Sequence, residues 1–227
     1  MNLRLAKFAK LASIAGAMVA LSACNGGDDS SSTALTFTGT AATGKAIPGG
    51  TVVVTCKSGT GTATTLADGS YKVDVANGAG PCLVEVTKDG TTLRSVAPSA
   101  GVINVTPLTD MQVTYLATRA GTTPSQLAAN LTSTTTNTTK AILADTTAIA
   151  GAASAVATTV KAATGVEVGT DFRTATLVAN GTGADKVLDD LKAAGAVTSA
   201  GAPSTTIVSS VTTEAQKQPP YVAPTGS

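Results

Sequence analysis

Histidine and tryptophan are absent from this 227-residue chain, and charged and aromatic side chains are scarce. Charged residues make up 13% of the sequence, about half of the roughly 25% that is usual for a globular protein. Without histidine the chain cannot form a Ser-His-Asp triad, a Cys-His pair or a histidine-ligated metal site. A formal net charge of +1 lacks the basic footprint that binds nucleic acid, so no nucleic-acid partner is expected. The composition therefore excludes several enzyme classes and names no activity.

The first 23 residues have the parts of an export signal. Arg4, Lys7 and Lys10 are basic, and an apolar run over residues 11–23 follows them. This run is too short to span a bilayer, which needs about 20 apolar residues, but it matches the apolar part of a signal peptide. Residues 1–23 are therefore predicted to be a signal peptide.

The apolar run ends in Leu21-Ser22-Ala23-Cys24, which resembles the lipobox of bacterial lipoproteins. In that family the cysteine thiol is diacylated, the signal is cut before the cysteine, and the new amino group is acylated. The resemblance implies that Cys24 is lipidated and holds the chain on a membrane, since several acyl chains anchor stably. The alternative is an ordinary cleaved signal with a chance cysteine. Asn25 stands where an aspartate would resemble the inner-membrane retention signal, which implies the outer membrane of the cell envelope, facing the periplasm or the surface.

Removal of the signal peptide changes the charge balance. The remaining chain carries 12 basic and 14 acidic residues, a formal charge of −2. This charge excludes attachment through a polybasic surface, so acylated Cys24 is the expected membrane contact. Residues 24–33, which continue as Asn-Gly-Gly-Asp-Asp-Ser-Ser-Ser-Thr after the cysteine, lack apolar periodicity and are predicted to be a flexible tether.

The three cysteines are an odd number for an exported protein. Lipidation of Cys24 would leave Cys56 and Cys82, and an oxidising compartment would join these two in a disulfide. The alternative is a pair of buried free thiols. Two cysteines are too few for a cysteine-only metal site, so no metal and no cofactor is expected.

Residues 34–106 alternate short β-branched runs with turns rich in glycine, aspartate, asparagine and proline. The run Tyr71-Lys72-Val73-Asp74-Val75 shows the two-residue period of a half-buried strand. Seven strands are expected, at Leu35–Thr40, Thr51–Cys56, Thr62–Leu66, Tyr71–Val75, Cys82–Thr87, Thr92–Ser95 and Val102–Val105. Strands and turns at this spacing predict an antiparallel β-sandwich, transthyretin-like or immunoglobulin-like.

Part of this region resembles a known family. The residues that carry the resemblance are Gly39, Gly44, Ala46-Ile47, Gly49, Val52-Val53-Val54 and Ala67-Asp68-Gly69-Ser70-Tyr71. In this order they look like the carboxypeptidase regulatory-like domain. The resemblance implies a transthyretin-like β-sandwich with the Tyr71 ring in its core, and a spacer, adhesion or substrate-presenting role. It implies no catalysis, because the zinc-binding catalytic domain of carboxypeptidases needs histidine.

Residues 107–197 are predicted to be mostly helical, which makes the chain an α+β protein. Thr106 is a good N-cap and Pro107 suits the first helical position. Gly121 is expected to close the first helix and Pro124 to open the second. Residues 132–139 hold six threonines, one serine and one asparagine, which are poor helix formers, so a break is expected there.

The Ala-rich stretch Ala141–Thr164 is predicted to be a helix with a narrow apolar stripe, and a disordered stalk is the alternative. Phe172 is a candidate core residue, and a final helix is expected between Thr182 and Gly195. The tail, residues 198–227, is predicted to be partly disordered. Within it Thr205–Val211 is β-prone and would add a strand to the sandwich edge, and the Pro-rich residues 218–224 would be extended.

Few residues suggest chemistry. Asp185, Asp189 and Asp190 form either a cation site or, as favoured here, a complement to a helix dipole on a solvated face. Glu85 and Glu167 could meet as the carboxylate pair of a glycoside hydrolase.

The function expected from the sequence is that of a non-catalytic lipoprotein of the bacterial envelope, a structural or interaction module with a possible envelope protein as partner. The first alternative is a lipoprotein that binds a small molecule or a glycan at a site between the sandwich and the helices. A hydrolase that uses carboxylates is the third possibility.

Overall fold

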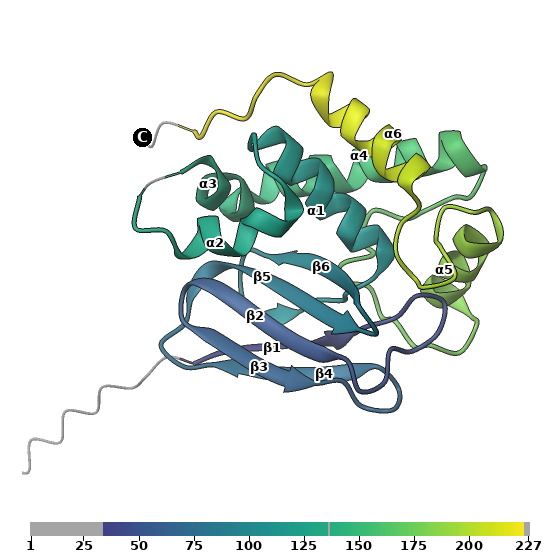
Figure 1. Cartoon of the computed structure of the whole chain (residues 1–227), viewed down its shortest axis with the longest axis horizontal. Coiled ribbons are helices and arrows are strands. Elements are labelled where there is room, and N and C mark those ends of the chain that lie inside the picture. The colour runs from purple at the N-terminus through teal and green to yellow at the C-terminus, as the bar shows by residue number, and fades with distance from the viewer. Residues whose placement is uncertain (1–33, 136, 225–227) are drawn as a thin grey trace, which may run out of the picture. The chain divides into compact units, whose positions relative to one another are not determined.

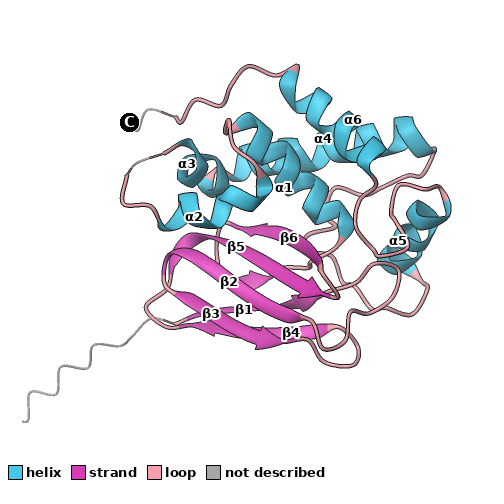
Figure 2. Ribbon diagram, viewed as in Figure 1, coloured by secondary structure: helices cyan, strands magenta, loops and turns pink. Residues whose placement is uncertain are grey.

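The computed structural model describes residues 34–135 and 137–224. The predicted signal peptide and the whole predicted tether, including Cys24, lie outside the described residues. Within them the chain is a mixed α+β protein with two sheets and six α-helices, shown in Figures 1 and 2.

The two sheets contain three and four strands. The strands are β1 (Leu35–Thr40), β2 (Thr51–Ser58), β3 (Thr60–Thr64), β4 (Ser70–Val75), β5 (Ala79–Lys88), β6 (Thr91–Ala97) and β7 (Gly101–Val102). Their order is β4-β1-β7 in one sheet and β3-β2-β5-β6 in the other. The four-stranded sheet is antiparallel throughout.

The expectation of purely antiparallel pairing is wrong at β7, which pairs parallel with β1. The chain leaves β6 in one sheet and arrives beside β1 in the other, running in the same direction as β1. The expected strand over residues 102–105 is also shorter than predicted. Beyond Val102 the chain still follows β1, because the backbone N–H groups of Ile103 and Val105 donate to the carbonyls of Thr38 and Thr40.

Side chains from both sheets form one hydrophobic cluster, which we call the sheet core. Its members are Phe37, Ala41, Val52, Val54, Cys56, Tyr71, Val73, Val75, Cys82, Val84, Val86, Leu93, Ala97, Ile103 and Val105. Tyr71 is 4% exposed, so its ring lies in the core, where the resemblance to the regulatory-like domain implies that it should lie. Its hydroxyl donates to the carbonyl of Ile103, so the polar tip of the ring is satisfied inside the core.

Helix α1 (Pro107–Arg119) begins and ends where the sequence predicts. The Thr106 hydroxyl accepts from the backbone N–H of Thr109, and Pro107 occupies the first turn. At the other end Gly121 has φ +70°, a left-handed conformation that closes helices readily only in glycine. These local signals therefore set both helix boundaries.

The threonine-rich stretch breaks the helical region as expected. A 3₁₀ turn (Pro124–Gln126) leads into α2 (Leu127–Thr132), and α3 (Thr138–Ala144) follows the break. The stretch Ala141–Thr164 is helical and not a disordered stalk, but the single helix predicted there is interrupted at Asp145, between α3 and α4 (Thr146–Thr164). The Asp145 carboxylate caps α4 by accepting from the N–H groups of Thr147 and Ala148.

The strand expected within the tail is wrong, because its residues lie in helix α6 (Thr205–Gln216). The Pro-rich residues 218–224 contain no helix or strand, and Tyr221 bonds to Arg119 and Asp145. The β-branched side chains of α6 recur at helical spacing, and Ile207, Val211 and Ala215 face the other helices. Contact with α1 and α4 therefore overrides the low intrinsic helix propensity of this segment. Helix α5 (Gly183–Ala193) lies between Thr182 and Gly195 as predicted.

A second hydrophobic cluster, which we call the helical core, joins the helices to the four-stranded sheet. It includes Leu83 of β5 and Val96 of β6 together with buried residues of all six helices. Helix α1 packs on β6, α2 on β2 and β5, and α3 on β5, so the helices cover one face of this sheet (Figure 2). Phe172 belongs to the same cluster.

No single helix in the described part of the chain is long and apolar enough to cross a bilayer. Helices α3 and α4 pass the length and composition test together, but the pair is bent by 80°.

Candidate functional site

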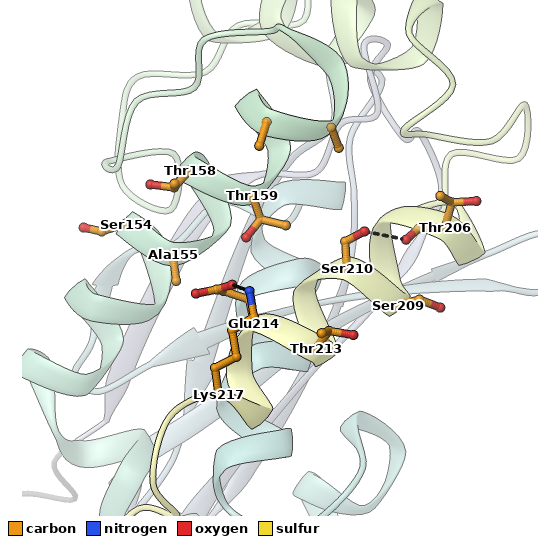
Figure 3. Close-up of a pocket in the computed structure, with 12 residues that line it drawn as sticks. Ser154, Ala155, Thr158, Thr159, Thr206, Ser209, Ser210, Thr213, Glu214 and Lys217 are labelled. Carbon is orange, nitrogen blue, oxygen red and sulfur yellow. Dashed lines mark hydrogen bonds and ion pairs between the residues drawn. The ribbon is translucent and has the colours of Figure 1, made fainter.

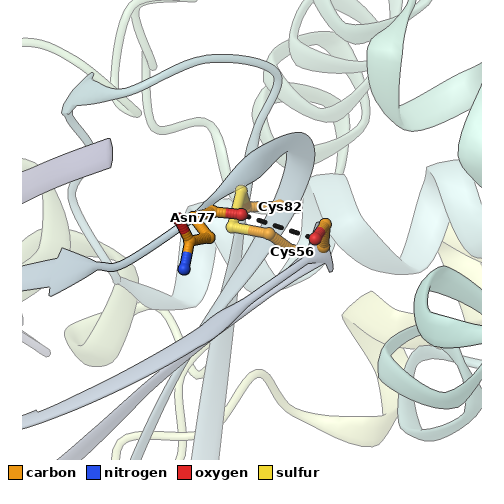
Figure 4. Close-up of a disulfide and its surroundings, with 4 residues drawn as sticks. Cys56, Asn77 and Cys82 are labelled. Atoms are coloured by element: carbon orange, nitrogen blue, oxygen red, sulfur yellow. Dashed lines mark hydrogen bonds between the residues drawn. A yellow bond between two sulfur atoms is a disulfide. The ribbon is translucent and has the colours of Figure 1, made fainter. Parts of the chain in front are cut away.

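Cys56 and Cys82 form a disulfide between β2 and β5 (Figure 4). The two residues lie directly opposite each other in the antiparallel register, with Cα atoms 3.9 Å apart. Both are fully buried in the sheet core. Beside them the Ser58 hydroxyl donates to the carbonyl of Asn77, which ties the end of β2 to the turn before β5. The cysteine pair that the sequence predicts is therefore present in the structure.

Three charged side chains meet where α1 crosses the four-stranded sheet. Arg94 of β6 donates through Nε to Glu85 Oε1 at 2.9 Å, and its Nη1 lies 3.6 Å from Asp110 Oδ1. Burial raises the pKa of Asp110 to about 6, although the Arg94 charge opposes that rise. Because the Arg94 side chain is only 17% exposed, this group is sheltered from solvent. Its contacts hold α1 on the sheet.

A second polar group fastens the segment after α6. The Tyr221 hydroxyl donates to Asp145 Oδ2 at 3.0 Å, and its backbone N–H donates to the carbonyl of Arg119. The Arg119 guanidinium in turn donates to the carbonyl of Pro219. Burial, aided by the bond to Asp145, raises the pKa of Tyr221 to about 12. The backbone N–H of Ala148, followed by smaller contributions that include Tyr221, lowers the pKa of Asp145.

A groove of about 950 Å³ runs between α4 and α6. Figure 3 shows hydroxyl side chains from both helices along it. They are Ser154, Thr158, Thr159, Thr206, Ser209, Ser210 and Thr213. The charged residues Glu214 and Lys217 form an ion pair at 2.8 Å at one end of the groove. Apart from this ion pair, the polar side chains along the groove are small, neutral hydroxyl groups.

The three aspartates of α5 point to different partners. The Asp185 carboxylate is 1% exposed and accepts from the backbone N–H of Gly181. Asp190 pairs with Lys186 at 2.7 Å, while Asp189 lies against Gly44. No cluster of three or more potential metal ligands exists among the described residues. The arrangement matches the helix-terminus and solvated-face interpretation for Asp185 and Asp190.

The two glutamates considered as a hydrolytic pair lie in separate ion pairs. Glu85 pairs with Arg94 on the sheet, and Glu167 pairs with Lys161 at the end of α4. The structure therefore does not bring this pair together.

The sequence analysis missed the polar groups around Arg94 and Arg119. Asp145 carried a local signal, because an aspartate before Thr146-Thr147 is a good helix N-cap. Tyr221 carried a weaker one, since it is one of three tyrosines in the chain. Their contacts join segments far apart in the sequence, so no local pattern indicated them.

Comparisons with known proteins give no relative: no family model matches the chain, and no curated protein and no solved structure is significantly similar to it.

Proposed function

We propose that this chain is a lipid-anchored protein of the bacterial envelope that acts as a non-catalytic structural or interaction module. The observation that carries the proposal is the disulfide between Cys56 and Cys82. Disulfides persist in oxidising compartments outside the cytoplasm, which is where the predicted export signal would deliver the chain. The pairing also leaves Cys24, the last residue of Leu-Ser-Ala-Cys, as the cysteine available for acylation. Two separate parts of the sequence thus support the same compartment.

The contacts of the charged side chains Arg94 and Asp145 support a structural role for this chain. Arg94 joins two carboxylates to hold α1 on the sheet, and Asp145 combines a helix cap with a bond to Tyr221. In both groups the charged side chains connect elements of the fold. We infer that the groove between α4 and α6 is the surface through which the module contacts an envelope partner, because most of its hydroxyl side chains are exposed and available for hydrogen bonds.

We further propose that the two sheets form a β-sandwich of the transthyretin-like kind, as the resemblance to the carboxypeptidase regulatory-like domain implies. The common sheet core and the buried Tyr71 ring support this assignment. The short parallel strand β7 is a departure from simple antiparallel pairing.

Lipidation is tested by mass spectrometry of the protein purified from bacterial membranes. We expect a mature N-terminus at Cys24 carrying acyl chains, and we expect Cys24→Ala to leave the precursor uncleaved and unacylated. Cys56→Ser is the matched control, which should keep both acylation and cleavage. Cleavage at any other residue, or an unmodified Cys24, would contradict the anchor.

The destination is tested separately by membrane fractionation. The wild-type protein and Asn25→Gln should both reach the outer membrane, whereas Asn25→Asp should remain in the inner membrane. Retention of the wild-type protein in the inner membrane would contradict the outer-membrane assignment.

The interaction role is tested by photo-crosslinking in cells. A crosslinking residue at Thr158, in the groove, should capture one envelope protein reproducibly. The same residue at Lys72, an exposed position of strand β4, is the control and should not capture it. Absence of any adduct from Thr158 would contradict the interaction surface.

A further inference from the structure

An apolar pocket lies between the start of α1, helix α5 and the loop that joins α4 to α5. The loop covers residues 165–182 and contains no helix or strand, and structureless loops of this length in compact proteins are often functional. Pocket walls come from Leu108 of α1, Phe172 and Leu177 of the loop, and Leu188 of α5. The groove between α4 and α6 shares no lining residue with this pocket.

Polar contacts from the sheet hold the loop in place. The Asn104 side chain, 2% exposed, donates to the carbonyls of Ala175 at 2.7 Å and Phe172 at 3.3 Å. Its backbone N–H donates to the carbonyl of Arg173 at 2.7 Å. The Thr40 hydroxyl adds a bond to the carbonyl of Leu177 at 3.1 Å. Because these bonds position the loop, the pocket is largely preformed, as small-molecule sites usually are.

The volume of the pocket indicates the size of its ligand. The pocket holds about 280 Å³. A cavity of about 150 Å³ lined by similar apolar side chains takes up benzene. Scaled by volume from benzene in that cavity, this pocket fits a molecule of about eleven non-hydrogen atoms.

The rim of the pocket is acidic. Asp171 and Thr176 line it and are exposed to solvent. The Asp171 carboxylate lies over Gly169, where a Cβ atom would come within 2.8 Å of Oδ1. No basic side chain forms an ion pair with Asp171 in the described part of the chain. A ligand cation at the rim would therefore find a carboxylate free to pair with it.

We propose that this pocket binds a small primary amine with a compact apolar body, of the arylalkylamine class. The apolar body lies between Leu108, Phe172 and Leu188, and the ammonium group donates to the Asp171 carboxylate and is exposed to water on its other side. This binding site goes beyond the proposed anchoring and interaction role and does not depend on it.

Tryptamine is a suitable probe, because its indole ring and ethylammonium group match the size and polarity of the pocket. The experiment titrates the mature protein in detergent micelles, with empty micelles as the blank, by calorimetry and amide chemical shifts. We expect saturable one-to-one binding, with the largest shifts in residues 166–177 and 184–188. Indole, which lacks the ammonium group, should bind about tenfold more weakly, because charge-assisted hydrogen bonds are the stronger ones.

Two variants test the apolar pocket and the Asp171 carboxylate separately. Ala184→Phe places a ring in the pocket and should abolish binding, while Ala193→Phe, on the same helix outside the pocket, should leave it unchanged. Asp171→Asn keeps the shape of the rim and should weaken tryptamine about tenfold without affecting indole. Unaltered far-ultraviolet circular dichroism and melting temperature confirm that each variant is folded.

Each remaining outcome overturns the proposal. Absence of saturable binding, or binding that survives Ala184→Phe, overturns the site. Equal affinity for indole and tryptamine, or no effect of Asp171→Asn, overturns the amine as ligand. Because none of these readouts involves Cys24 or a partner protein, they are independent of the tests of the anchor and the groove.

Discussion

The sheet core and the helical core of this protein are built by different means. They meet at strand β5, which we call the shared wall. The sheet core is formed mainly by strand residues that follow the two-residue period, and it contains one disulfide, which joins the adjacent strands β2 and β5. The helical core collects side chains from six helices of unequal length, several of them rich in threonine. Strand β5 serves both, because Val84 faces the sheet core while Leu83 belongs to the helical core.

This shared wall explains a departure from alternation in the sequence. The segment Pro81-Cys82-Leu83-Val84 is buried at every position. A strand that faces solvent on one side alternates apolar and polar residues, whereas a strand covered on both faces is continuously apolar. The apolar run in β5 therefore indicates that this strand is covered on both faces, one by the sheet core and the other by the helical core.

Truncation of the shared wall should have the largest effect. Leu83→Ala removes a fully buried side chain at the helix–sheet contact and should destabilise the protein by about 4 kcal/mol. Because strand β5 contributes side chains to both cores, we expect the sheets and helices still to unfold in a single transition. Thermal unfolding followed by circular dichroism, with hydrogen exchange resolved by residue, measures this. Separate melting of the helices, with unchanged protection of the strands, would show that the cores are independent.

Loss of the disulfide tests the sheet core alone. The double substitution Cys56→Ser and Cys82→Ser opens a loop with a sequence separation of 26 residues, and the chain-entropy estimate for such a loop is about 3.5 kcal/mol. Chemical denaturation of the oxidised protein and of the double variant measures the difference. Reduction of the wild-type protein should reproduce most of the loss, while the same reductant should leave the double variant unaffected.

The two regions also differ in how far their sequence predicted their structure. Strand β1 has the predicted bounds, because its period is local and nearby turns limit it. The bounds of helix α1 were equally predictable, because Thr106, Pro107 and Gly121 are local signals. Helix α6 was not predictable from its own sequence. Its β-branched residues favour a strand, and contact with α1 and α4 stabilises the helix instead.

The candidate sites also differ in how far the sequence predicted them. The count of cysteines and the export signal predicted the pairing of Cys56 with Cys82. The pocket around Phe172 was not predictable, since its walls come from α1, α5 and an irregular loop that Asn104 holds in place. A single asparagine that organises a distant loop has no signature in a sequence pattern.

The group formed by Arg94, Glu85 and Asp110 should make the free energy of unfolding depend on pH. The folded-state pKa of Asp110 is about 6, above its ordinary value of 3.8. A carboxyl group with a raised pKa stabilises the fold while it is protonated, so stability should fall as pH rises from about 4 through about 6. The shift of about two units corresponds to about 3 kcal/mol.

Asp110→Asn should remove this fall, as measured by the free energy of unfolding at intervals between about pH 4 and about pH 7. Asp190→Asn, which alters an exposed carboxylate paired with Lys186, is the control and should keep it. The pKa of Asp145 is lowered instead, so its contribution is lost at more acidic pH and does not overlap this window. An unchanged pH profile in Asp110→Asn would place the titrating group elsewhere.

The smallest effect is expected at the edge of the helical core, where Tyr221 meets Asp145. Tyr221→Phe removes one hydrogen bond at a partly exposed position and should cost about 0.5–1 kcal/mol. The backbone bond from residue 221 to the Arg119 carbonyl would then open more often, so its amide should exchange faster while the sheet-core amides stay protected. Val222→Ala, at an 81% exposed position, is the matched control and should change neither quantity. If Tyr221→Phe instead lowered protection in the strands, the segment after α6 would be coupled to both cores through α1, and the edge of the helical core would have to be treated as part of the shared wall.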